Sequence, residues 1–319
     1  MNRRNFLKST TMTMAASTLA WPYGLNSAGA GQPPFKISLA QWSLHRRLQG
    51  RSGKEPLDNL DFAKTARELG IEGLEYVNQF FMDKARNGEY LKEMNRRASG
   101  EGAVNLLIMV DREGQLGHPD SAERKQTVEN HLKWLEAAAT LGCHSLRVNA
   151  ASRGTYEEQQ KLAADGLRQL SEKGDEFGLN VIVENHGGLS SNGKWLSGVM
   201  DLVDHLRCGT LPDFGNFLID PEKGEWYDIY QGMEDLMPYA KAVSAKSYDW
   251  GVSTDPNVTV SQRKGRESQV DFKRSMEIVL KHGYDGYVGI EYEGLKHPEM
   301  EGIALTKAVL DRLSAELGS

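Results

Sequence analysis

The feature that most constrains this chain is a regular alternation of short apolar runs with longer amphipathic stretches, from Phe35 to the C-terminus. Apolar runs are typical of strands covered on both faces, and amphipathic stretches are typical of helices that pack on such a sheet. The rhythm therefore predicts repeated strand–helix units with a parallel sheet. The predicted strands are Lys36–Gln41, Gly73–Val77, Asn105–Val110, Ser145–Val148, Asn180–Glu184, Gly209–Asp213, Ala242–Lys246 and Tyr287–Tyr292.

Eight such units predict an α/β fold made of a single (β/α)8 TIM barrel. With 319 residues, 39% of them hydrophobic, the chain is long and apolar enough for one large domain. Gly142 and Gly283 each stand where a predicted helix gives way to a strand, as a left-handed C-terminal cap requires. No linker-like break or second domain is visible, and the polar segment 249–269 is predicted to be a long loop after strand seven.

The N-terminus carries an export signature. Residues 3–8 (RRNFLK) match the twin-arginine pattern, a weakly apolar stretch follows over 9–20, and 28–30 (AGA) supplies the small residues of a cleavage site. We therefore expect residues 1–30 to be a twin-arginine signal peptide, residues 31–319 to be the mature barrel, and the protein to be exported to the periplasm. The alternative is a basic, disordered N-terminus.

Charge and apolar length limit the partners. Residues 1–30 contain three basic residues and no acid, so the formal charge of −6 becomes −9 after cleavage. No basic stripe of the kind that neutralises phosphates follows, which argues against nucleic-acid binding. The N-terminal apolar run is too short to cross a bilayer, so we expect no stable membrane anchor.

Cys143 and Cys208 are expected to be small buried hydrophobes rather than a disulfide. The oligomeric state is left open.

Three predicted strands carry an acid at or next to their carboxyl end. Glu184, Asp213 and Glu291 hold these places on strands five, six and eight, and the carboxyl ends of barrel strands meet at the rim that carries the chemistry. Each acid alone is compatible with a surface salt bridge. Together at equivalent strand ends they predict a metal site, since a buried carboxylate needs a compensating cation. Oxygen ligands without cysteine favour Mg, Mn, Co or Zn, and the sequence does not choose among them.

The chain resembles the xylose isomerase-like TIM barrel superfamily, and most closely its exported branch of sugar phosphate isomerase/epimerase-like proteins. The resemblance covers the chain from about Phe35 to the C-terminus. Its most specific motifs are VENHGG at 183–188, LPDFGNF at 211–217, VSAKSYD at 243–249 and GIEYEG at 289–294.

The resemblance implies a metal held by acids at strands five, six and eight and by a histidine at strand seven. Glu184, Asp213 and Glu291 match the acids, and in the family's epimerases the two glutamates exchange protons with the substrate. The histidine position is Ser244 here, with Lys246 two residues on along the same strand face. A second histidine that is common in the family is replaced here by Asn216, which becomes a candidate substrate contact. With Ser244 and Asn216 at these positions, the resemblance leaves the metal's fourth ligand unassigned.

Lys246 is a third catalytic candidate. Its ammonium could offset the charge of the acids, stabilise a developing enolate or protonate a leaving oxygen; the alternative is a lysine that extends into solvent. Other polar residues on the same rim are candidates for substrate binding, each with a purely structural alternative. They are His186, Arg147, Asn149, His45, Glu75 and Tyr248.

These residues predict an enzyme that removes a proton next to the carbonyl of a neutral or oxidised sugar, with Glu184 and Glu291 as base and acid. A phosphorylated substrate is disfavoured, because the chain is expected to be exported and lacks a glycine-rich phosphate loop. The first alternative is a lyase or hydratase that uses the same site on a 3-keto-glycoside. The second is a carbohydrate-binding barrel without catalysis.

Overall fold

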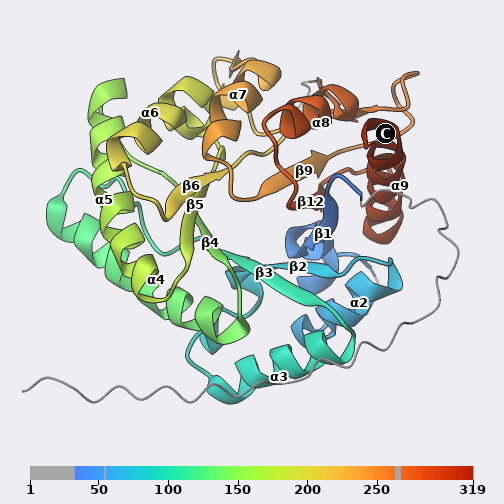
Figure 1. Cartoon of the computed structure of the whole chain (residues 1–319), viewed down its shortest axis with the longest axis horizontal. Coiled ribbons are helices and arrows are strands. Elements are labelled where there is room, and N and C mark those ends of the chain that lie inside the picture. Colours follow the sequence, from blue (N-terminus) through green and yellow to red (C-terminus); the bar gives the residue numbers. More distant parts are fainter. Residues whose placement is uncertain (1–32, 54, 263–266, 319) are drawn as a thin grey trace, which may run out of the picture. The chain divides into compact units, whose positions relative to one another are not determined.

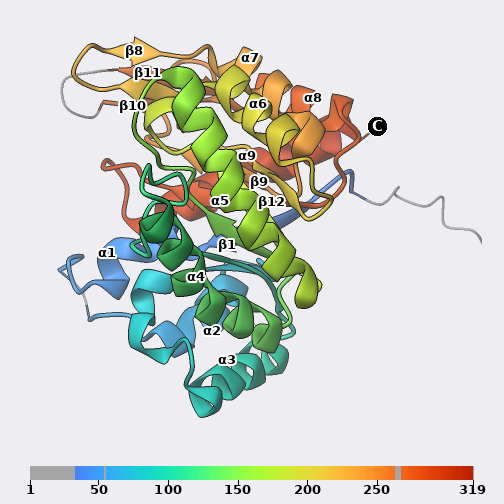
Figure 2. The ribbon, with the colours of Figure 1, turned by 90° about the vertical axis from the view of Figure 1, so that its left-hand side faces the viewer.

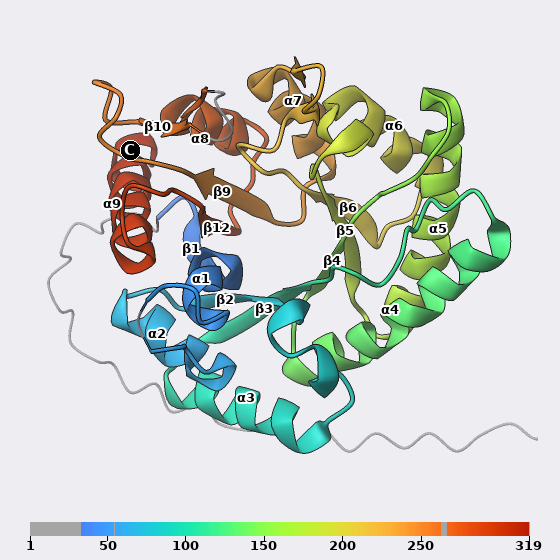
Figure 3. The ribbon, with the colours of Figure 1, turned by 180° about the vertical axis from the view of Figure 1, so that it is seen from behind.

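The structure is a computed structural model that describes residues 33–53, 55–262 and 267–318. The predicted signal peptide lies outside these residues. Eight parallel strands form one sheet in the order β6-β5-β4-β3-β2-β1-β12-β9, and Figures 1 and 3 show it curling inside a ring of helices. The predicted barrel is thus confirmed. The strands are β1 Lys36–Ala40, β2 Gly73–Val77, β3 Val104–Met109, β4 Ser145–Val148, β5 Asn180–Glu184, β6 Cys208–Leu211, β9 Val243–Ser247 and β12 Tyr287–Tyr292.

The barrel closes between β6 and β9, next to the candidate site residues Asp213 and Ser244. Isolated parallel bridges join Thr210 to Ala240 and Asp213 to Ser244. The backbone N–H of Ser244 donates to the carbonyl of Pro212 at 2.9 Å, and that of Phe214 donates to the carbonyl of Ser244 at 3.0 Å. Because this seam passes through Asp213 and Ser244, closing the barrel also fixes the backbone of two site residues.

Helices alternate with the strands, as their amphipathic sequences require. The longest ones begin at side-chain caps: Asp120 accepts from two backbone N–H groups at the start of α4, and Thr155 forms a capping box with Glu158 at the start of α5. Gly142 ends α4 with φ 73°, the left-handed cap that was predicted. The helices are α1 His45–Leu48, α2 Phe62–Glu68, α3 Gly88–Gly100, α4 Ser121–Leu141, α5 Tyr156–Glu176, α6 Gly193–Val203, α7 Ile229–Leu236, α8 Phe272–Lys281 and α9 Glu299–Leu317.

Apolar side chains fill most of the barrel interior below its carboxyl rim, with Glu75 and Ser38 as a buried polar pair among them. Since side chains alternate along a strand, Ile182 points to the same side as Glu184, and Ala242 to the same side as Ser244. An apolar layer therefore supports the acids from beneath. Its buried members are Ala40, Val77, Leu107, Met109, Ile182, Leu211 and Ala242.

Two hairpins extend the carboxyl rim. Strands β7 (Leu218–Asp220) and β8 (Glu225–Trp226) follow β6, and β10 (Val258–Ser261) pairs with β11 (Ser268–Asp271) after β9. Figure 2 shows β8, β10 and β11 gathered at one end of the barrel. The prediction of one long loop over 249–269 was therefore wrong: β10 alternates apolar and polar residues, and Val260 of β10 and Val270 of β11 are buried.

Cys143 and Cys208 are both free, as expected, although Cys208 is only partly buried because it begins β6. In the part of the chain that the structure describes, no helix combines the length and the apolar character that crossing a bilayer would take.

Candidate active site

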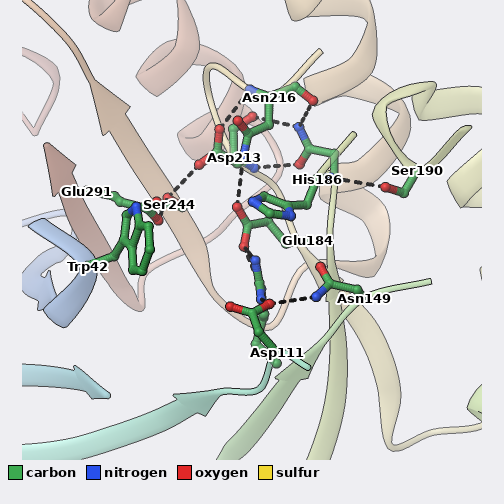
Figure 4. A network of polar contacts seen from close by, with 12 residues as sticks. Trp42, Asp111, Asn149, Glu184, His186, Ser190, Asp213, Asn216, Ser244 and Glu291 are labelled. Carbon is green, nitrogen blue, oxygen red and sulfur yellow. Dashed lines mark hydrogen bonds and ion pairs between the residues drawn. The ribbon is translucent and has the colours of Figure 1, made fainter. Parts of the chain in front are cut away.

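The carboxyl rim brings three acids together. Glu184 ends β5, Asp213 follows β6 and Glu291 lies near the end of β12, and each is at most 4% exposed. One carboxylate oxygen from each lies within 4.8 Å of the others. Figure 4 shows Glu184 and Asp213 beside Ser244 and Glu291. Residues far apart in the sequence thus form a single buried cluster, which we call the acid cluster.

Glu184 is held as a carboxylate from both sides. The guanidinium of Arg147 donates from Nε to Glu184 Oε2 at 2.5 Å, and also contacts it through Nη2. Asn216 Nδ2 donates to the other oxygen, Oε1, at 2.9 Å. Burial alone would raise the pKa of Glu184, but the charges of Arg147, His186 and Lys246 together outweigh it and lower that pKa below its ordinary value.

Asp213 is oriented by its own loop. Its Oδ1 accepts from the backbone N–H groups of Gly215 and Asn216, each at 2.8 Å, which leaves Oδ2 to accept from Ser244 Oγ at 2.8 Å. Burial raises the pKa of Asp213 well above its usual range. Ser244, the residue that stands at the family's histidine position, therefore lies against the acid cluster as a hydroxyl donor.

Lys246 is the cation of the acid cluster. Its Nζ lies 2.8 Å from Glu291 Oε1, 3.4 Å from Glu293 Oε1 and 4.0 Å from Asp213 Oδ2, and the residue is 2% exposed. This position rules out a lysine that extends into solvent. Burial raises the pKa of Glu291 to about 7, although the Lys246 ammonium opposes that shift.

The residues of the acid cluster fit a divalent cation. Three carboxylates converge in a buried place, and the raised pKa values of Asp213 and Glu291 indicate that Lys246 does not fully offset the cost of burying their charge. Three oxygen donors suit Mg²⁺, Mn²⁺, Co²⁺ or Zn²⁺ with further positions left for water or substrate. Glu184, Asp213 and Glu291 would be the protein ligands.

Asp111 extends the site on the side of β3, and sequence reasoning missed it. Its Oδ1 accepts from Arg147 Nη1 at 2.9 Å and from Asn149 Nδ2 at 2.7 Å, and its Oδ2 accepts from Gln79 at 2.9 Å. Burial would raise the pKa of Asp111, but the charge of Arg147 and the hydrogen bonds from Asn149 and Gln79 act with His186 to outweigh it and lower the pKa to about 2. The signal was present, because this acid directly follows the predicted strand 105–110.

Arg147 therefore bridges two carboxylates, and Asn149 is held beside it. The Oδ1 atom of Asn149 is buried without a hydrogen-bond partner among the described residues. An unpaired buried acceptor next to a reactive cluster is suited to a substrate hydroxyl, since leaving it unpaired costs about 1–3 kcal/mol.

A cavity of about 590 Å³ adjoins the acid cluster. His186, Asn216 and Tyr248 line it, as do glycines of the loops after β5 and β6. His186 is solvent-accessible, and Figure 4 places its ring beside Glu184. The structure thus puts three of the predicted substrate contacts on the wall of one cavity.

His45 and Glu75 lie outside this cavity. His45 stacks on Trp42 with ring centroids 4.8 Å apart, and its Nδ1 lies 2.7 Å from the Trp42 carbonyl oxygen. Trp42 in turn donates to Glu293 at 2.7 Å. His45 therefore packs on Trp42 and does not face the acid cluster. Glu75 points into the barrel interior, where Ser38 Oγ donates to it at 2.5 Å. Neither residue is among the described ones that line the cavity.

The sequence over residues 63–313 matches the family model for xylose isomerase-like TIM barrels. The chain belongs to the xylose isomerase-like TIM barrel family. No curated protein matches it significantly.

Solved structures of this barrel type are similar to the chain over most of its length. A 3-keto-D-glucoside 4-epimerase from E. coli has 16% identity and a TM-score of 0.66, with 87% of this chain and 99% of that one covered. A xylose isomerase-like protein from Mycobacterium smegmatis in complex with magnesium has 15% identity and a TM-score of 0.63, covering 89% and 98%. A D-psicose 3-epimerase from Clostridium cellulolyticum, solved with D-tagatose, has 14% identity and a TM-score of 0.59, covering 82% and 91%. At these identities the likeness concerns the fold.

Proposed function

We propose that this xylose isomerase-like barrel is an exported, metal-dependent sugar isomerase or epimerase that removes a proton next to the carbonyl of a neutral or oxidised sugar. The observation that carries the proposal is the acid cluster: three buried carboxylates from different strands, with ligand oxygens within 4.8 Å of one another. The similar folds named for a keto-glucoside 4-epimerase and a psicose 3-epimerase support the substrate class. The twin-arginine signature supports export.

Each residue has a task that follows from its contacts. A bound divalent ion supplies Lewis acidity for the sugar carbonyl. Glu184 takes a proton from the neighbouring carbon, with its carboxylate held by Arg147 and Asn216. Glu291 returns a proton, since it comes from β12, which is not adjacent to β5 in the sheet, and so approaches from another side. Proton removal on one face and return on the other inverts the carbon.

A lyase acting on a 3-keto-glycoside is the second candidate, and Lys246 favours it. Its buried ammonium contacts Glu291 and lies 3.4 Å from Glu293, so a proton donor stands beside the acids. A cation there would stabilise an enolate or protonate a departing β-oxygen. Both candidates begin with the same proton abstraction and differ only in what the enolate does next.

The test uses Glu184→Gln and Glu291→Gln, which keep the shape of each side chain but remove a base and a charge. Each is expected to abolish turnover of the Mn²⁺-loaded protein with the fold retained, as judged by circular dichroism. Glu113→Gln is the matched control, because Glu113 is also buried and paired with a lysine, Lys133 at 2.8 Å, outside the site.

Two substrates separate the candidates. A 3-keto-glucoside and a free ketose are followed for both aglycone release and C-epimer formation. Epimer formation without aglycone release excludes the lyase. Full activity in either glutamine variant overturns the mechanism, and chelator-insensitive sugar binding without turnover by the wild type indicates a carbohydrate-binding barrel instead.

A further inference from the structure

The cavity beside the acid cluster extends beyond the place where the reacting carbon must lie. Asn216 lines the cavity and donates to Glu184, and Figure 4 places the ring of His186, another lining residue, beside Glu184, so the cavity opens onto the acids. The described residues that form its wall do not include Glu184, Asp213 or Glu291. Its volume of about 590 Å³ is therefore space in addition to the reactive centre, within the range of about 300–1,000 Å³ found for ligand sites.

The β7–β8 hairpin supplies an apolar part of the cavity wall. Leu218, Pro221 and Trp226 lie on the β7–β8 hairpin, and Leu218 pairs directly with Trp226 across it. Trp226 is 38% exposed, whereas Trp134, Trp195 and Trp250 are at most 5% exposed. Gly187, Gly188 and Gly215 also line the cavity and fill none of it with side chains. An indole in a cavity with such small lining residues leaves room for a ring to stack on it.

The hairpin is anchored firmly enough to act as a wall. Tyr227, directly after β8, donates its hydroxyl to Asp235 of α7 at 2.7 Å, and its backbone N–H donates to the carbonyl of the buried Phe217 at 2.9 Å. At the tip, Asp220 Oδ1 accepts from the backbone N–H groups of Glu222 and Lys223. Trp226 is thus presented from a fixed backbone.

We propose that this cavity is a subsite for a second ring joined to the reacting sugar, so that the substrate is a glycoside rather than a free monosaccharide. The inference rests on the proposed function, because it takes the acid cluster as the reactive centre. The reacting sugar lies over the acids, and its attached ring stacks on Trp226 across the cavity. Aromatic rings and the apolar faces of sugars both stack on indole, so an aryl group and a second sugar are the two sources of this ring.

Equilibrium binding to the metal-loaded protein tests the subsite without requiring turnover. Isothermal titration compares methyl β-D-glucoside, which lacks a second ring, with phenyl β-D-glucoside and cellobiose. The ringed ligands are expected to bind at least about tenfold more tightly, an advantage of about 1.4 kcal/mol. In Trp226→Ala the advantage is expected to fall below about threefold, with the affinity for the methyl glucoside unchanged, and Trp226→Phe is expected to restore part of it.

Phe177→Ala is the matched control, because Phe177 is a similarly exposed aromatic residue, at 40%, and lies just before β5 at the opposite end of the barrel. It is expected to leave all affinities unchanged. A preference for the phenyl glucoside over cellobiose assigns the ring as aromatic, and the reverse assigns it as a sugar. Three results overturn the subsite. They are equal affinity of the methyl glucoside and the ringed ligands, tighter binding of the ringed ligands that persists in Trp226→Ala, and no binding of either ringed ligand.

Failure of the subsite and failure of the proposed function give different results. Glu291→Gln is expected to keep the preference for a second ring while losing proton exchange. Trp226→Ala is expected to keep proton exchange on a free keto sugar while losing the preference.

Discussion

Replacement of Lys246 by methionine removes the charge at the centre of the acid cluster while keeping most of the side-chain length. Its ammonium contacts Glu291 at 2.8 Å and lies 4.0 Å from Asp213, in a residue that is 2% exposed. The substitution leaves these buried carboxylates close together without the positive charge that offsets their repulsion. Two properties are expected to change: the stability of the metal-free protein and the rate of the chemical step.

The structure sets the size of each effect. Removing one partner of a buried ion pair costs about 3–5 kcal/mol, which for a chain of this size lowers Tm by roughly 6–10 °C. A divalent ion bound by the same carboxylates replaces the lost charge, so saturating Mn²⁺ is expected to raise the Tm of Lys246→Met more than that of the wild type. If Lys246 stabilises or protonates the developing oxygen, kcat falls by at least about a hundredfold.

Thermal unfolding with chelator and with Mn²⁺, combined with kcat on the best substrate, measures both effects. Lys281→Met is the control, since Lys281 makes a 2.7 Å ion pair with Glu234 at the surface, with its side chain 65% exposed. It is expected to change stability by less than about 1 kcal/mol and to keep full activity. A Lys246→Met protein with unchanged metal-free Tm and kcat refutes the reasoning, and lost stability with full kcat makes Lys246 a structural counter-ion only.

Two further predictions concern residues around the acid cluster. Asp111→Asn removes the charge that pairs with Arg147 and accepts from Asn149, so kcat is expected to fall about 10- to 100-fold and Tm is expected to fall as well; an unchanged kcat would show that Arg147 does not need this partner. Glu75→Gln addresses pH: burial raises the pKa of Glu75 from 4.5 to about 8, so the folded protein prefers the neutral acid. The stability that Glu75 contributes is then greatest below pH 4.5 and falls by about 1.4 kcal/mol per pH unit up to about pH 8. Glu75→Gln is expected to raise Tm more at pH 8 than at pH 5, and an equal gain at both pH values contradicts it.

The barrel could be predicted from the sequence because its signal is local and repeated. Strands such as Ser145–Val148 and Tyr287–Tyr292 are short apolar runs whose bounds the structure reproduces. The two hairpins could not be predicted with the same ease. Their strands are two to four residues long, and their pairing depends on where the barrel loops bring them.

The acids of the site were predictable for the same local reason, since each ends or follows an apolar strand. Their partners were not, because Arg147 and Glu184 are 37 residues apart, and Lys246 and Glu291 are 45 apart. Such contacts depend on the strand order and register of the closed barrel. His45 shows the converse: it follows strand one, but its helical turn stacks it on Trp42 instead of directing it to the acids.

Deuterium exchange tests the central claim most directly. The protein is loaded with Mn²⁺ and incubated in D₂O with a 3-keto-glucoside or a free ketose, and mass spectrometry and NMR locate the deuterium taken up. We expect metal-dependent incorporation at the carbon next to the carbonyl, abolished by chelator and by Glu184→Gln or Glu291→Gln, and retained in Glu113→Gln. The double variant Glu184→Gln/Glu291→Gln is measured with metal bound as well. If the wild type incorporates deuterium no faster than this variant, the result contradicts proton abstraction at the acid cluster.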